Sequence, residues 1–238
     1  MGQGIQQPSV EQGGAGSALA DVFKVLLEPT AVFERVRARP RFLMPFLVIC
    51  VIQIVLFFVN LPYITAAVQA QAATRPAGGP DPTKFIWIGA VFIPIGIGLA
   101  LVIGALLLWV LVSLFGGEGK FATLLSVSTY ASVPSVILLA IVGAIVLRMR
   151  GIGGITSQQD LQPALGVDLL APGTAGFMGA ALKAINPFSI WGLVLTAIGV
   201  STTHRLSKGT GYAIATIVFV IGVLIAAAFA GMFAGRAG

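Results

Sequence analysis

The sequence has little charge. Asp, Glu, Lys and Arg together make up 9% of its 238 residues, against about 25% in an ordinary soluble domain. Five stretches contain none of these four amino acids, namely 42–74, 85–117, 121–147, 184–203 and 209–235. Each is long enough to cross a hydrocarbon core about 30 Å thick, which takes roughly 20 apolar residues of helix. The scarcity of charge therefore excludes a soluble protein and predicts an all-α, polytopic membrane helix bundle with five transmembrane helices.

We expect the five helices at about 42–60, 85–115, 124–147, 187–203 and 211–233. Residues 1–17 are rich in Gly, Gln and Ser, and this composition predicts a disordered N-terminal tail. Residues 18–238 then form a single membrane domain.

Cysteine and histidine are almost absent. Cys50 and His204 are the single examples, so no intrachain disulfide can form and a metal site that needs three or four ligands has no candidate set. The predicted spans also hold no acid or base, whereas pumps, ion-coupled transporters and intramembrane proteases keep such groups inside the membrane. We therefore expect no catalytic residue, no cofactor and no metal site, and predict that the protein is not an enzyme.

The formal net charge is +6. The Lys and Arg residues gather at the ends of the predicted spans and form no stripe with interleaved aromatic residues, so we expect no nucleic-acid partner. With a cytoplasmic N-terminus, eight of the 14 basic residues face the cytoplasm, and those within 35–41 beside the first span weigh most. This bias predicts an integral membrane protein with its N-terminus in the cytoplasm and its C-terminus outside.

Residues 18–39 place apolar and charged side chains on different faces of a helical pattern that Pro29 interrupts. The pattern predicts two short amphipathic helices. They either lie in the plane of the membrane interface or pack as a lid on the bundle, and the sequence leaves both arrangements open. The predicted interfacial anchors are Phe23, Leu26 and Phe33, together with Trp191 at the start of the fourth span.

Hydroxyl groups recur in the first half of the third span. Ser128, Ser132 and Ser135 follow one another at i, i+4 and i+7 and so share a helix face, with Tyr130 nearby. Such a face either forms hydrogen bonds to neighbouring helices or lines a polar cavity. Both interpretations remain open from the sequence.

Small residues recur every four positions in two spans. Ala227, Gly231 and Gly235 form one row, and Ala100 and Gly104 form another. Rows of this kind let helices approach closely. They predict helix–helix contacts, either within one chain or between subunits.

Three segments together resemble the Yip1 domain family of five-span membrane proteins. The first is an amphipathic and basic stretch that leads into the first span, at 26–47. The second, 119–139, is a Gly-rich turn and a span in which Pro134 follows Tyr130 by four residues. The third, 185–214, opens with the pattern Asn-x-Phe-x-x-Trp at Asn186 and ends in a basic turn. The resemblance covers about residues 20–232.

The resemblance implies five helices, a cytoplasmic N-terminus and no catalytic residues. Eukaryotic relatives are associated with Rab-type GTPases and carry a longer N-terminal region than this chain, so we expect no Rab-type partner. The short tail is similar to that of prokaryotic members and implies the prokaryotic cytoplasmic (inner) membrane.

Two functions remain open from the sequence. The first is a non-enzymatic interaction component that organises a membrane assembly or the bilayer, with membrane lipids and a protein partner or a second copy as its contacts. The alternative is a conduit or transporter for a lipid or an uncharged small solute.

Overall fold

The computed structural model describes residues 15–73 and 81–234. In these residues it contains ten α-helices and no strand, so the protein is an all-helical bundle. The helices in chain order are α1 (Ala15–Lys24), α2 (Pro29–Ala38), α3 (Leu43–Val59), α4 (Leu61–Ala73), α5 (Ile86–Leu114), α6 (Phe121–Ala131), α7 (Leu139–Arg150), α8 (Gly176–Ala184), α9 (Pro187–His204) and α10 (Lys208–Ala234). Helix α1 begins at Ala15, inside the segment predicted to be a tail, and residues 1–14 lie outside the described part of the chain.

Three continuous helical segments are long and apolar enough to cross a membrane, namely Pro82–Leu114, Phe121–Arg150 and Lys208–Met232. Two bent pairs also qualify if each is counted as one span: α3 with α4, bent by 62°, and α8 with α9, bent by 60°. On that count the described residues form up to five spans. The protein is thus a polytopic membrane protein, as the charge-free stretches predict.

Both bends have a local cause. Pro62 stands at the start of α4, where its missing N–H removes no helical hydrogen bond. At the other bend, the side chain of Asn186 accepts hydrogen bonds from the N–H groups of Phe188 (3.1 Å) and Ser189 (3.0 Å) and so caps α9. Pro187 occupies the first turn of that helix. Each bend therefore starts a new helix without leaving its first N–H groups unpaired.

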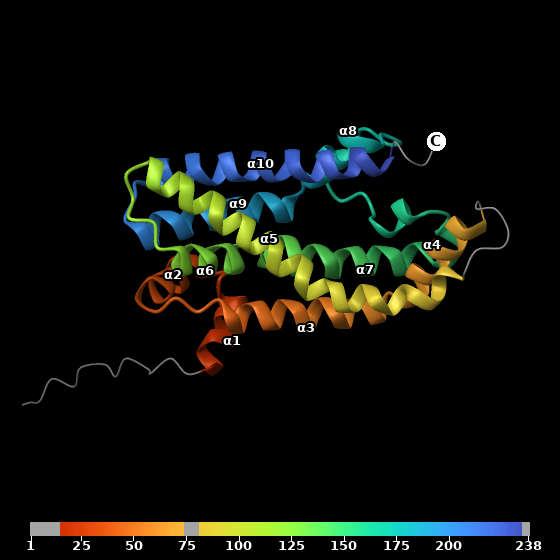
Figure 1. Ribbon diagram of the computed structural model, residues 1–238, viewed down its shortest axis with the longest axis horizontal. Helices are drawn as coiled ribbons and strands as arrows, with labels where there is room; N and C mark the ends of the chain where they lie inside the picture. The colour runs from red at the N-terminus through yellow and green to blue at the C-terminus, as the bar shows by residue number, and fades with distance from the viewer. Residues whose placement is uncertain (1–14, 74–80, 235–238) are drawn as a thin grey trace, which may run out of the picture.

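The long axes of α3, α5, α6–α7, α9 and α10 run roughly side by side (Figure 1). At one end of this bundle lie α2 and the connections α5–α6 and α9–α10, and at the other end lie α4 and α8. Helix α8 packs along α10. One end of the bundle therefore carries α2 and two connections between spans, whereas the other carries two short helices, α4 and α8.

The third span changes its winding at Pro134. This residue has no N–H to donate, and a π-helical turn, Pro134–Leu138, joins α6 to α7 at this point. The N–H of Leu139 bonds to the carbonyl of Pro134, and the side-chain amide of Gln53 on α3 donates to the carbonyl of Val136. A polar side chain of the first span thus satisfies a carbonyl of the third.

Helices α1 and α2 pack as a lid on the bundle and contribute side chains to its main core. Val22 of α1, Val25 in the turn that follows it and Val32 of α2 are fully buried, and α2 packs on α9 while α1 packs on α3. The prediction that Phe33 is an interfacial anchor is wrong, because its side chain is fully buried where Gly199 of α9 leaves room for the ring.

An ion pair joins the two helices of the lid. The guanidinium of Arg35 on α2 donates from Nε to Oδ2 of Asp21 (3.1 Å) and from Nη2 to Oδ1 (2.6 Å). This two-point geometry is the strong form of the interaction, and the hydrogen bond to Asp21 raises the pKa of Arg35. The Asp21 side chain is 10% exposed and the Arg35 side chain 46% exposed. The pair therefore joins a desolvated carboxylate to a guanidinium that also reaches water.

Candidate functional site

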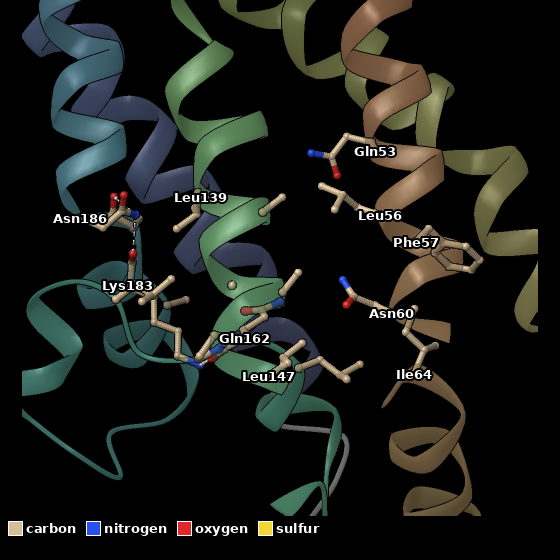
Figure 2. Close-up of a pocket in the computed structure, with 18 of the residues that line it drawn as sticks. Gln53, Leu56, Phe57, Asn60, Ile64, Leu139, Leu147, Gln162, Lys183 and Asn186 are labelled. Carbon is tan, nitrogen blue, oxygen red and sulfur yellow. Dashed lines mark hydrogen bonds between the residues drawn. The ribbon is translucent and has the colours of Figure 1, made fainter. Parts of the chain in front are cut away.

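The larger described cavity has a volume of about 670 Å³ and lies at the end of the bundle that carries α4 and α8. Its walls come from α3 and the start of α4 on one side and from α8, the start of α9 and α10 on the other. Figure 2 shows Leu139 and Leu147 of α7 between these two walls. Apolar side chains make up most of the lining, as in ordinary small-molecule sites.

Two polar side chains enter this cavity from α3. Gln53 and Asn60 are seven residues apart and so lie on the same helix face, directed towards α7 (Figure 2). Gln53 donates to the carbonyl of Val136, and Oδ1 of Asn60 accepts a hydrogen bond from Nη1 of Arg148 (3.0 Å). Nη2 of Arg148 also donates to the carbonyl of Val59 (3.1 Å). These bonds hold the C-terminal half of α3 against the third span and keep that side of the cavity in place.

The opposite wall carries the charged groups. Lys183, in the last turn of α8, donates from Nζ to the carbonyl of Gln162 (3.3 Å). Asp168, on the short 3₁₀ turn Val167–Leu170, is 7% exposed. Its Oδ1 accepts from the N–H of Gly166 (2.9 Å), whereas no described residue donates to Oδ2. Asp168 and Lys183 both line the cavity, and neither forms an ion pair within the described part of the chain.

The smaller cavity, about 200 Å³, lies against the serine face predicted in the third span. Ser128, Ser132 and Ser135 all line it, and α9 adds Ser189 and Thr196. Tyr130 is not among its lining residues, because that side chain is turned into the main core and is 1% exposed. The structure thus brings the three serines together and leaves the tyrosine out.

The hydroxyl groups of the serine face all donate to main-chain carbonyls. Ser128 bonds across to Leu101 of α5 (3.3 Å), Ser132 to Thr129 (2.8 Å) and Ser135 to Ser132 (3.1 Å). A hydroxyl that donates keeps two acceptor lone pairs. The face therefore contributes one bond to helix packing and leaves acceptor positions along the cavity wall.

The small residues of the two rows mainly contact other helices of the same chain. A Cβ added to Gly104 would come within 3.0 Å of Oγ of Ser128, so Gly104 allows α5 to approach α6. Ala227 is fully buried, and a Cβ on Gly231 would lie 3.4 Å from Cβ of Phe177 on α8. Ala100 is exposed, and Gly235 lies outside the described residues.

The remaining anchor residues differ in exposure. Phe23 is 55% exposed, Trp191 is 38% exposed and Leu26 is half-buried against the main core. Leu19 and Leu27 are also exposed, at 43% and 87%. Leu19 and Phe23 lie four residues apart on α1, and Leu27 follows in the turn just after the last residue of that helix, Lys24. We call these three residues the outer strip of α1. The opposite side of the same segment is buried through Val22 and Val25.

Sequence reasoning missed the charged wall of the larger cavity and the ion pair of the lid. The spacing of Gln53 and Asn60 was a usable signal, since two amides on one face of an apolar span call for partners. Asp168 and Lys183 gave no such signal, because they lie 15 residues apart in a segment without a regular pattern. They reach one cavity only through the path of the chain between α7 and α8.

Comparison with known proteins gives one family and one relative. The sequence model of the Yip1 domain matches residues 23–230. The membrane protein YknW of Bacillus subtilis (strain 168) is 29% identical over 237 residues, which cover 96% of this chain and 97% of that protein. No solved structure matches the chain.

Proposed function

The chain belongs to the Yip1 domain family, and we propose that it is a non-enzymatic integral membrane protein that organises a membrane assembly. Its contacts are membrane lipids and either a protein partner or a second copy of the chain in the same membrane. The non-enzymatic part of the proposal rests on the charge-free spans, which offer no acid or base for catalysis.

The observation that carries the organising role is the outer strip of α1. Helix α1 packs on α3 through the buried Val22, and the pair of Asp21 with Arg35 joins it to α2, which packs on α9. Its outer strip nevertheless exposes large apolar side chains, up to 87% at Leu27. Exposed apolar groups on a fixed support are typical of surfaces that contact another protein or the membrane interface.

The charge beside the strip favours a site at the membrane surface. Lys24, Arg37 and Arg39 of the same helix pair are exposed. Each basic residue near an anionic leaflet contributes about 1 kcal/mol of attraction. We therefore place α1 and α2 at the cytoplasmic face of a prokaryotic cytoplasmic membrane, with the C-terminus outside, which agrees with the bias of the basic residues along the sequence.

Native mass spectrometry of the protein, extracted gently from its own membrane, tests the organising role. We expect a stoichiometric complex with a protein partner or a second copy. The variant Leu27→Asp should lose that complex, because a charge on the outer strip is costly to bury in an apolar interface. Leu170→Asp is the matched control, since Leu170 is 84% exposed on the 3₁₀ turn Val167–Leu170, which packs on α8 and not on the lid. A monomer without a partner, both in native membranes and after extraction, would refute the proposal.

The smaller cavity favours a second candidate, a conduit for an uncharged solute or a lipid. The hydroxyl acceptors of its serine face would replace water around a polar solute. Solute flux into liposomes should then fall when Ser132 and Ser135 are both changed to Leu, and should persist in the control Ser207→Leu, outside this cavity. Flux that is unchanged by the double variant removes this candidate.

A further inference from the structure

The larger cavity presents two charges that the fold does not use. Asp168 is only 7% exposed to solvent, and its Oδ2 receives no hydrogen bond from any described residue. Most buried polar atoms in proteins have a partner, and a buried carboxylate oxygen without one costs more than a neutral group. An unpaired negative charge at a cavity wall therefore calls for a donor or a cation from outside the chain.

Lys183 supplies the opposite charge on the same cavity. Its ammonium has three N–H donors, and one of them bonds to the carbonyl of Gln162. The remaining donors have no acceptor among the described residues, and no ion pair joins Lys183 to Asp168. The polar end of the cavity thus offers separate positions for an anionic and a cationic group.

The rest of the cavity is suited to hydrocarbon. Leu56, Phe57 and Ile64 line one side, and Ala226 and Ala230 of α10 line the other. The volume of about 670 Å³ falls within the range of about 300–1,000 Å³ found for ligand pockets. Of the lining helices, α10 is a candidate span and α3 forms one together with α4.

We propose that this cavity binds a membrane phospholipid whose headgroup carries both a phosphate and a primary ammonium. The phosphate lies at Lys183, the ammonium lies on the side of Asp168, and the acyl chains follow the apolar walls towards the bilayer. Two charges of opposite sign in a mostly apolar pocket match a zwitterionic amphiphile better than an anionic lipid or an uncharged solute. In the low dielectric of the cavity wall the buried carboxylate acts on a cation over several ångströms. The site is independent of the organising role, which depends on the other end of the bundle.

The test measures which lipid stays bound. The full chain is placed in nanodiscs of equal parts phosphatidylethanolamine and phosphatidylglycerol, extracted gently and weighed by native mass spectrometry. We expect phosphatidylethanolamine to be retained about tenfold over phosphatidylglycerol, the ratio that a single charge-assisted hydrogen bond provides. Asp168→Asn should bring this ratio close to one. Lys183→Gln should lower the retention of both lipids, because both contain the phosphate.

Matched variants separate the site from general effects. Glu118→Gln removes a carboxylate at the opposite end of the bundle and should leave the ratio unchanged. Gly143→Leu fills the cavity, where an added Cβ has only Pro163 nearby at 3.9 Å, and should abolish retention of both lipids. Gly96→Leu adds the same side chain to an open position on α5 and is the control for it.

Several results would overturn the proposal. Equal retention of the two lipids by the unchanged protein would refute the selectivity, and this outcome does not depend on any variant. A ratio that survives Asp168→Asn in a folded, monodisperse protein would refute the role of the carboxylate. Displacement of the retained lipid by soluble glycerophosphoethanolamine at equal concentration would show that the acyl chains contribute nothing, and would overturn the assignment to a membrane lipid. If the unchanged protein forms no protein complex but still retains the lipid selectively, that result would instead contradict the organising role alone.

Discussion

The ion pair between Asp21 and Arg35 provides a sharp test of how the two helices of the lid are held together. The two partners differ in solvent exposure, 10% for the Asp21 side chain and 46% for that of Arg35. Removing one partner therefore costs a different amount from removing the other. We compare Arg35→Met, which keeps an apolar stem, with Asp21→Asn, which keeps the shape of the carboxylate.

The expected costs follow from what each variant leaves behind. Arg35→Met leaves a desolvated carboxylate without its guanidinium, and such a group costs about 2–3 kcal/mol. Asp21→Asn leaves a guanidinium that already reaches water, so the loss is about 1 kcal/mol or less, as for exposed ion pairs. The difference of roughly 1.5 kcal/mol corresponds to about a tenfold change in the equilibrium between α1 packed against α2 and α1 detached from it.

Hydrogen–deuterium exchange of the full chain in nanodiscs measures this equilibrium, because local opening governs the exchange of amides in a helix. Amides of α1 should exchange about tenfold faster in Arg35→Met than in Asp21→Asn. Amides of α6 serve as the internal control and should keep their rates. The double variant should resemble Asp21→Asn alone, since the unpaired carboxylate is gone. Faster exchange in Asp21→Asn than in Arg35→Met would refute the reasoning.

Three further predictions test other parts of the fold. Gly199→Ala places a Cβ 2.7 Å from Cγ1 of Val127 and should lower thermal stability by about 1–3 kcal/mol, whereas Gly222→Ala, with no atom within 4 Å, should be neutral or slightly stabilising. The hydrogen bond from the N–H of Thr156, together with those from nearby hydroxyls, lowers the pKa of Asp160 from its ordinary 3.8. The ionised carboxylate therefore stabilises the folded turn fully above pH 3.8, and this stabilisation is lost as the pH falls through the lowered pKa of the folded protein. A spin label in the 155–161 turn should become mobile only in that acid range, and Asp160→Asn should make it mobile at neutral pH. In a cysteine-free background, a membrane-impermeant maleimide should label Thr174→Cys in intact cells and Glu118→Cys only after lysis, and the reverse pattern would contradict a cytoplasmic N-terminus.

The sequence predicted the membrane bundle well because one strong signal determines it. A helix without charged residues over 20 or more positions has few alternatives to a bilayer, and the helices α5 and α10 lie close to the predicted spans. The serine face was also within reach, since the spacing of Ser128, Ser132 and Ser135 fixes their common direction. Both inferences depend only on residues within one helix: the length of its apolar stretch for the spans and its 3.6-residue period for the serine face.

Other features depended on contacts between segments far apart in the chain. Phe33 has the pattern of an interfacial anchor, but Gly199 on α9 creates the space that buries it. Nothing within residues 18–39 indicates this glycine. In the same way, the walls of the larger cavity come from α3, α8 and α10, and only the folded chain brings these walls together.

The arrangement of the two candidate sites makes them separable by experiment. The outer strip of α1 lies at the end of the bundle with α2, and the larger cavity lies at the end with α4 and α8. If the N-terminus is cytoplasmic, the strip faces the inner leaflet and the charged wall of the cavity faces the outer one. Sites this far apart without shared partners have nearly additive effects. A change at Leu27 should therefore alter the assembly without altering lipid retention, and a change at Asp168 should do the reverse. An effect of either change on both readouts would mean that the spans between them transmit a two-state change.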